Sequence, residues 1–150
     1  MTTEASSADL LALDNQVCFA IVTAARNVVS IYRPILEPLG LTHPQYLVML
    51  ALWEQSPRSQ RELADELALD PATLSPLVKR LQAQGLIARE RRHEDERVID
   101  VRVTEKGAAL RARALMVPAQ VMERVGADEH ALRALRDALA PFSGARTQFP

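Results

Sequence analysis

Cys18 is the only cysteine in a chain of 150 residues. A single cysteine cannot form a disulfide within its own chain. Its thiol is therefore either a small packing group or a reactive group that an oxidant converts and an external thiol then modifies. The neighbouring sequence, L-D-N-Q-V-C-F-A, holds no lysine or arginine, and Asp14 stands one helical turn earlier. We expect Cys18 to lie inside a long helix, away from its N-terminus, where these neighbours favour the packing role.

Basic side chains between Lys79 and Arg102 form a second group that could do chemistry. This span holds seven basic and five acidic residues, although the whole chain has a net charge of −1. Local positive charge is the electrostatic requirement for contact with a phosphate backbone. Asp95 and Arg97 are two residues apart, so they share a face on an extended strand. The carboxylate could then hold the guanidinium in one pose, which suits insertion into a minor groove.

Other catalytic or metal-binding patterns are missing from the sequence. His43, His93 and His130 are far apart, and neither a C-x-x-C pair nor a G-x-S-x-G turn occurs. A thiol peroxidase would need a resolving thiol and an activating base in addition to Cys18. We therefore expect no enzyme activity, no cofactor and no metal site.

Composition and hydropathy are typical of a globular chain. Hydrophobic residues make up 48% and charged residues 25%, and no apolar run reaches the roughly 20 residues that span a bilayer. The polar N-terminus, M-T-T-E-A-S-S-A-D-L, lacks the basic and apolar regions of a secretory signal. We expect one domain over residues 1–150, located in the cytoplasm and without contact to a membrane.

The first predicted helix, over residues 8–36, is apolar on nearly every side. A helix of this kind is buried on more than one face. In so short a chain, a partner subunit is the simplest cover for the second face. Pro34 and Pro38 should disturb the helix, and Gly40 should end this stretch.

Three shorter helices are predicted next, over 43–55, 59–68 and 71–84. Each begins after a capping residue, and the N-cap residues are Thr42, Ser59 and Asp70. The expected buried stripes are Tyr46, Leu47, Leu50 and Ala51 in the first helix, Leu63, Ala64 and Leu67 in the second, and Leu74, Leu77, Val78 and Leu81 in the third. Gly85 is placed to cap the end of the third helix.

Two strands are predicted after these helices, over 86–91 and 97–103, with a charged hairpin H-E-D-E at 93–96 between them. Ile99, Val101 and Val103 share one face of the second strand. The fold class is therefore mainly α with a small β-hairpin wing.

Two helices are predicted at the C-terminal end. Thr104 caps one that runs to about residue 125 with a kink near Pro118, and Asp128 caps one that ends before Pro141. Residues 1–8 and 143–150 are expected to be flexible tails.

The order of two short helices and a charged hairpin is typical of a winged helix-turn-helix, whose second helix enters the major groove of DNA. The face of helix 71–84 that points away from the core should hold Ala72, Thr73, Ser75, Pro76, Lys79 and Arg80. Small hydroxyl groups near the helix start could approach base edges, and Lys79 and Arg80 could hold phosphates or read guanine. The pattern alone leaves open a surface feature without DNA, such as part of a dimerisation module.

The run D-P-A-T-L-S-P-L-V-K-R-L-x-x-x-G-L-I-x-R, followed by D-E-R in the hairpin, resembles the multiple antibiotic resistance regulator (MarR) family over about residues 10–140. The resemblance implies a homodimeric winged-helix repressor on a pseudo-palindromic operator of double-stranded DNA. Dimerisation helices would lie at about 10–40 and 104–142, and the DNA-binding region at 43–103. The DNA contacts that it implies are Thr73, Ser75, Lys79 and Arg80 on the helix and Asp95 and Arg97 in the wing.

Three further motifs, L-D-N-Q-x-C-F, Y-R-P-I-L and P-Q-Y-L-V-M-L-x-L-W-E, lie outside the DNA-reading helix. They resemble the organic hydroperoxide resistance repressor branch of the family. This resemblance implies that organic hydroperoxides oxidise Cys18 and that the protein then leaves DNA. It also implies a sensor pocket with two tyrosines of the partner subunit. Tyr32 matches one of them, whereas His43 stands at the other position and could supply a hydrogen bond or an ion pair.

The lone cysteine limits the redox chemistry that follows. A sulfenic acid at Cys18 must react with a low-molecular-weight thiol or be oxidised further. We expect the bulky mixed disulfide to drive release from DNA. The alternative is a regulator of the same family that responds to a small phenolic or other ligand, with Cys18 purely structural.

Overall fold

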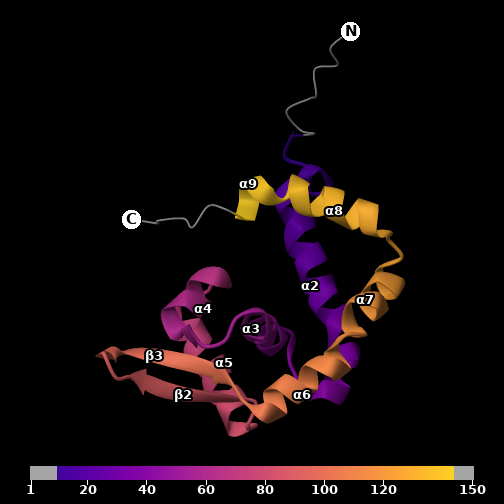
Figure 1. The fold of residues 1–150 in the computed structure, drawn as a ribbon. Helices are drawn as coiled ribbons and strands as arrows, with labels where there is room; N and C mark the ends of the chain where they lie inside the picture. Colours follow the sequence, from indigo (N-terminus) through magenta and orange to yellow (C-terminus); the bar gives the residue numbers. More distant parts are fainter. Residues whose placement is uncertain (1–9, 144–150) are drawn as a thin grey trace.

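The chain folds into a helical part and a part that carries a small sheet (Figure 1). The computed structural model describes residues 10–143. The predicted tails at 1–8 and 143–150 lie outside the described residues, except Ser143, which ends α9 (Ala140–Ser143). In the described part of the chain, no helix is long and apolar enough to cross a membrane.

The first long helix, α2 (Val17–Leu36), begins later than the sequence predicts. A short 3-10 turn, η1 (Leu13–Asn15), precedes it, and Gln16 lies between the two in an extended conformation. The side-chain amide of Gln16 donates hydrogen bonds to the carbonyls of Leu10 and Ala12, at 2.8 and 3.3 Å. These bonds fold the chain back before α2, so a continuous helix from residue 8 is wrong.

The end of α2 also differs from the prediction. Pro34 lies inside the helix, which continues to Leu36, so the expected disturbance there is wrong. A second 3-10 turn, η2 (Glu37–Leu39), contains Pro38. Gly40 then closes the turn with φ +69°, a left-handed conformation that a glycine adopts without strain.

Helix α3 (His43–Glu54) begins at the predicted cap. Thr42 and Gln45 form a reciprocal capping box, in which each side chain accepts from the other residue's backbone N–H. Its buried face was predicted only in part. Tyr46 and Ala51 are buried, but Leu50 is 40% exposed, and Val48, Met49 and Leu52 supply the core instead.

The two helices of the predicted reading unit form as expected. Helix α4 (Gln60–Glu66) starts with a capping box between Ser59 and Glu62. Helix α5 (Pro71–Ala83) starts at Asp70. The predicted stripe of α5 is fully buried: Leu74, Leu77, Val78 and Leu81. Gly85 ends the helix in the left-handed conformation, and the amide of Leu86 bonds back to the carbonyl of Leu81.

The sheet has three antiparallel strands in the order β1-β3-β2. Strands β2 (Ile87–Arg92) and β3 (Asp95–Val103) are the predicted hairpin, with a turn shortened to residues 93–94. The sequence analysis missed β1 (Arg58–Ser59), which pairs with β3 at Val101 and Asp100. Val101 is completely buried, so the base of the hairpin is anchored in the core.

The predicted helix from Thr104 to about residue 125 is in fact two helices. Helix α6 (Glu105–Ala114) ends before Leu115, and α7 (Val117–Val125) carries Pro118 in its first turn. Proline has no N–H to donate to the carbonyl four residues earlier, so the helical ladder breaks there. Asp128 caps α8 (Glu129–Ala138) as predicted.

Large apolar side chains remain uncovered on the helical part. Val17 and Val22 of α2 and Leu135 of α8 are 60%, 47% and 55% exposed. Helix α8 has no buried residue at all. The core lies between α3, α4, α5 and the sheet, and it also includes the end of α2 and buried residues of α6 and α7. The helical part therefore has an apolar surface that the described residues of this chain do not cover.

Candidate functional site

The start of α5 is held rigidly by its cap. The carboxylate of Asp70 accepts from the backbone N–H of Thr73 at 2.8 Å and from its hydroxyl at 3.1 Å. These hydrogen bonds hold the pKa of Asp70 below its ordinary value. The hydroxyl proton of Thr73 is thus directed at Asp70, and its oxygen lone pairs remain able to accept from a base edge.

The outer face of α5 carries the predicted cations. Lys79 and Arg80 are exposed, and neither forms an ion pair with any residue of the described range 10–143. Thr73 is exposed as well, whereas Ser75 is only half-exposed. The structure therefore brings Thr73, Lys79 and Arg80 together on one solvent-facing side of the helix, with Ser75 at its margin.

The wing is braced by ion pairs on one face. Arg92 donates to both carboxylate oxygens of Asp100, at 3.0 and 2.6 Å. The hydrogen bond from Arg92 holds the pKa of Asp100 below its ordinary value. Arg102 pairs with Glu90 at 3.1 Å, further from the tip. Because Arg92 and Arg102 form ion pairs within the wing, they are less available than unpaired basic residues to contact DNA phosphates.

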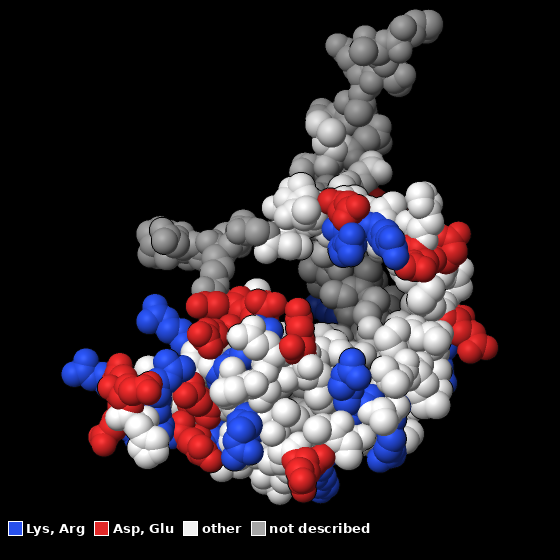
Figure 2. Space-filling view, in the orientation of Figure 1, with Lys and Arg blue, Asp and Glu red and all other residues white. Residues whose placement is uncertain are grey.

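The wing tip differs from the prediction in the contact that Asp95 makes. Its carboxylate accepts from the backbone N–H of Arg97 at 3.1 Å, and the expected pair with the Arg97 guanidinium is absent. Residues two apart share a strand face, but the carboxylate is short enough to reach the nearer amide first. The Arg97 side chain is exposed and has no acceptor within the described residues. Arginine side chains and acidic side chains alternate over this tip rather than forming a patch of one sign (Figure 2).

Cys18 is exposed and is the second residue of α2. The expectation that it lies far from a helix N-terminus is wrong, because the helix starts at Val17. The first backbone N–H groups of a helix have no acceptor within the helix. Cys18 therefore lies in the first turn of the helix and in contact with solvent, and it is not packed inside this chain.

The other two predicted sensor residues lie together in the structure. The rings of Tyr32 and His43 are 4.6 Å apart between centroids and tilted by 54°, and Tyr46 lies 5.8 Å beyond Tyr32. Burial lowers the pKa of His43 and raises that of Tyr32. The imidazole is therefore neutral at pH 7, which favours a hydrogen bond over an ion pair as its contribution.

One chain alone does not bring Cys18 to these rings. Cys18 and Tyr32 are fourteen residues apart on the same helix, a separation of about 21 Å at 1.5 Å per residue. The structure thus groups the predicted sensor residues into two separate places, the start of α2 and the junction of α2 with α3.

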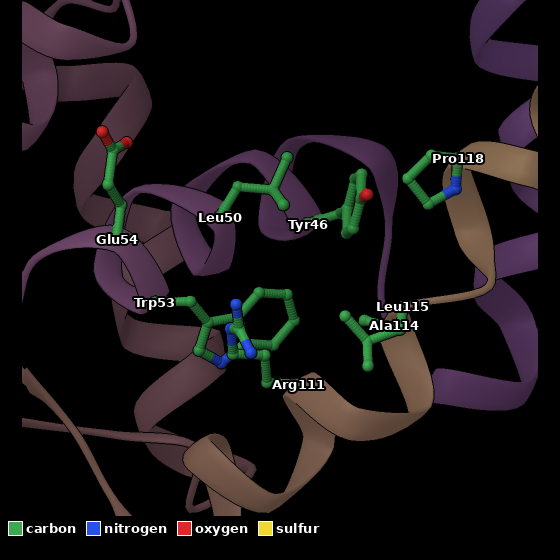
Figure 3. Close-up of a pocket in the computed structure, with 8 residues that line it drawn as sticks. All are labelled: Tyr46, Leu50, Trp53, Glu54, Arg111, Ala114, Leu115 and Pro118. Carbon is green, nitrogen blue, oxygen red and sulfur yellow. The ribbon is translucent and has the colours of Figure 1, made fainter.

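A cavity of about 310 Å³ lies between α3 and the break from α6 to α7 (Figure 3). Tyr46, Trp53 and Leu115 give it an apolar lining, and Arg111 and Glu54 stand at its polar side. The indole N–H of Trp53 donates to the carbonyl of Gly107 at 2.9 Å, so this wall is fixed to α6. The sequence analysis did not predict this cavity, since its walls come from distant helices.

The bracing pairs of the wing were also missed. Arg92 and Asp100 are eight residues apart and meet only because the hairpin folds back with an irregular register between Arg91 and Arg92. Asp100 was on the outward face of the second predicted strand, but Arg92 lies one residue beyond the first predicted strand, and the sequence does not give the register that brings the two together.

The geometry defines the class of protein. A short helix (α4), a turn and a second helix (α5) with a free polar face are followed by an antiparallel hairpin that ends in an exposed arginine. This is a winged helix-turn-helix, the architecture of DNA-binding regulators.

Comparisons with known proteins agree with this class. A family model described as transcriptional regulator SarA/Rot matches residues 30–113, which is more than half of the chain. The organic hydroperoxide resistance transcriptional regulator of Bacillus subtilis is 37% identical over 131 residues, 87% of this chain and 89% of the relative. The HTH-type transcriptional regulator TtmR of Methylorubrum extorquens is 42% identical over 88% of this chain and 68% of its own.

Solved structures show the same fold at lower identity. Overoxidised AbfR bound to DNA has a TM-score of 0.75 at 26% identity, covering 92% of this chain and 98% of its own. A MarR-family regulator from Rhodococcus sp. RHA1 has a TM-score of 0.78 at 27% identity, and the match covers 89% of this chain and 96% of that one. Bordetella bronchiseptica BpsR, whose DNA binding is regulated by 6-hydroxynicotinic acid, has a TM-score of 0.78 at 26% identity. The match covers 88% of this chain and 96% of BpsR.

The chain belongs to the MarR family of DNA-binding transcriptional regulators. Within that family it is similar to the organic hydroperoxide resistance regulator.

Proposed function

We propose that this protein is a homodimeric repressor that organic hydroperoxides release from its operator by oxidising Cys18. The observation that carries the proposal is the position of the thiol, exposed in the first turn of α2 and on a helix whose apolar surface one chain leaves uncovered. The 37% identity to the Bacillus subtilis regulator supports the same chemistry.

The uncovered helical part supports a dimer. Val17, Val22 and Leu135 are large apolar side chains in contact with solvent, on the helices α2 and α8 of the helical part (Figure 1). Exposed apolar surface of this size supports a protein interface. A second copy of the chain would cover it, and two-fold symmetry would place two α5 helices on half-sites about 10 base pairs apart.

The separation of the sensor residues also supports a dimer. Tyr32 near the end of α2, and His43 packed beside it at the start of α3, are too far from Cys18 of their own chain to reach it. A partner packed against α2 could bring its own Tyr32 and His43 to this thiol. The neutral imidazole of His43 would then act as a hydrogen-bond partner in the place where relatives are expected to have a tyrosine.

The chemistry has two steps. The sulfur of Cys18 attacks the terminal oxygen of the hydroperoxide, the O–O bond breaks, and an alcohol leaves with the proton, so that Cys18 becomes a sulfenic acid. A low-molecular-weight thiol then attacks this sulfur, a mixed disulfide forms, and the hydroxyl group leaves as water. The mixed disulfide adds bulk to a packed helix, which would shift the two α5 helices out of register with the operator.

Operator binding of the wild type and Cys18→Ser tests the proposal, each with hydroperoxide alone and with hydroperoxide plus a small thiol. We expect the wild type to be released, most fully when both reagents are present, and Cys18→Ser to stay bound. Equal release of the two proteins would overturn redox sensing. Equal release of the wild type with and without thiol would remove only the mixed-disulfide step.

A second candidate function rests on the cavity between α3 and the break from α6 to α7 (Figure 3). A small aromatic acid could place its ring against Trp53 and Tyr46 and its carboxylate at Arg111. BpsR, a relative in structure, responds to such a compound. A regulator of this kind would respond to its ligand equally in the wild type and in Cys18→Ser, which separates the two functions.

A further inference from the structure

Three segments meet behind the DNA-reading helix, on the side away from its free face. They are the turn at residues 38–40, the end of α5 and the start of α6. Gln84, the C-cap residue of α5, donates from its side-chain Nε2 to the carbonyl of Gly40 at 2.8 Å. These residues are 44 positions apart in the sequence, so this bond ties the reading helix directly to the end of α2.

Helix α6 and the residue before it hold both sides of this contact. Lys106 Nζ donates to the backbone carbonyl of Gln84 at 2.7 Å, and the Thr104 hydroxyl donates to that of Gly85 at 2.6 Å. Arg113 donates to the carbonyl of Pro38 at 2.8 Å. The last carbonyls of a helix need such outside donors. The junction is therefore a hydrogen-bonded node in which only Gln84 joins the turn to α5 by a side chain.

The other atom of the Gln84 amide shows why this residue is not there for stability alone. Its Oε1 is buried and has no hydrogen-bond partner among residues 10–143. Leaving a buried acceptor unpaired costs free energy, and an apolar side chain of the same length would avoid that cost. The amide of Gln84 therefore leaves one buried oxygen unpaired, and in return its nitrogen forms the hydrogen bond to the carbonyl of Gly40.

A movement of α2 would reach the DNA-reading part of the chain through the turn at 38–40. It joins α2, which carries Cys18 and Tyr32, to α3, which begins at His43. A cavity of about 430 Å³, lined by Leu39, Gly40, Gln84 and Lys106 among others, flanks the junction. Gln84 lines this cavity, and the hydrogen bond from its side chain to Gly40 is the specific link between α5 and the turn.

We propose that Gln84 is a positioning residue that couples the sensor helix to the reading helix. The inference rests on the proposed redox function. When α2 shifts, the turn carries Gln84 and the end of α5 with it, and the residues at the other end of α5 lose their fit to the operator. Without the Nε2 donor, α5 would keep its fold but would follow the turn less.

Gln84→Met tests this coupling, because methionine keeps the length of the side chain and removes both the donor and the unpaired oxygen. The readout is the operator Kd of the oxidised protein divided by that of the reduced protein. We expect this ratio to fall by about 3- to 30-fold relative to the wild type, the range for residues that transmit coupling. Thermal stability should be unchanged or higher, since no buried acceptor is left unpaired.

Gln60→Met is the matched control. Gln60 Oε1 is the other buried side-chain oxygen without a partner in the described range, and the residue lies in α4, away from the turn at 38–40. This variant should keep the wild-type ratio. Gln84→Glu, which keeps the shape but lacks the N–H donor, should repeat the loss seen with methionine.

A wild-type ratio in Gln84→Met and Gln84→Glu would overturn the coupling while leaving redox sensing intact. An equal fall in the Gln60→Met control would also overturn it, because the effect would then be general to the domain. A wild type that hydroperoxide and thiol do not release would overturn the proposed function itself, and the coupling with it.

Discussion

The guanidinium of Arg92 and the carboxylate of Asp100 form a two-bonded ion pair across the wing, at 3.0 and 2.6 Å. Glu90 stands directly opposite Asp100 in the sheet, so two acidic residues face each other and each is neutralised by an arginine of the other strand. Bidentate pairs of this kind fix side chains in one geometry. The wing is thus rigid below the tip that carries Arg97.

Asp100→Ala should weaken operator binding by about three- to tenfold. Without the Arg92 pair, the wing would become ordered only when it binds DNA, and this loss of conformational freedom reduces the free energy of binding. Glu90→Ala, at the position directly opposite Asp100, removes the more exposed ion pair between Arg102 and Glu90. This variant should change the operator affinity by less than about twofold. Fluorescence anisotropy with a labelled operator gives both constants. Equal effects of the two variants would show that wing rigidity does not depend on the Arg92 pair.

Arg97→Ala should weaken binding by about 5- to 50-fold on operators with A·T-rich flanks and less on G·C-rich flanks, because a narrow minor groove attracts an inserted arginine. Lys79→Ala should weaken binding to both operators alike and lower the slope of log K against log salt by about one. Affinities on paired operators at several salt concentrations check this. Loss of the same size for Arg97→Ala on both flanks would contradict minor-groove insertion.

Leu135→Asp should convert the protein to a monomer that no longer binds a two-half-site operator. Leu135 is 55% exposed in one chain and shares an apolar stripe with Leu132 of α8 and with Leu139, the C-cap residue of that helix. A buried unpaired carboxylate in an interface is strongly unfavourable. Ala134→Asp puts the same charge about 100° around α8 from Leu135, away from the apolar stripe, and should stay dimeric. Light scattering on a sizing column measures the mass, and a dimeric Leu135→Asp would contradict this interface.

Stability should fall between pH 7 and pH 5 partly through His43. Burial lowers the pKa of His43 in the folded chain, so below the unfolded value of about 6.5 the unfolded state binds the proton first. The stability that neutral His43 contributes is therefore complete above about pH 6.5, and it is lost as the pH falls through the pKa of His43 in the folded chain. His43→Phe keeps a ring beside Tyr32 and removes this loss. Urea unfolding at several pH values checks it, and parallel curves for both proteins would contradict it.

Local chemistry made part of the fold predictable. Thr42, Ser59 and Asp70 each cap a helix through hydrogen bonds to residues three positions away, so a short stretch of sequence contains the whole interaction. The apolar spacing in α5 marks its buried side for the same reason. These features were enough to place the reading helix and its exposed cations correctly.

Features that depend on distant segments were not predictable in this way. The late start of α2 follows from Gln16 folding its side chain back onto Leu10, and β1 is two residues long and exists only by pairing with β3. The Arg92 pair depends on strand register, and the Gln84 contact joins residues 44 positions apart. The sequence patterns placed Cys18 on the correct helix but on the wrong part of it.

The most direct test of the account is to follow Cys18 and the operator in one sample. Intact mass spectrometry gives the fraction of Cys18 carrying the small thiol as hydroperoxide is added, and anisotropy gives the fraction of operator still bound. We expect release to rise in step with modification of Cys18 and Cys18→Ser to show neither change. Full modification of Cys18 with the operator still bound would contradict it.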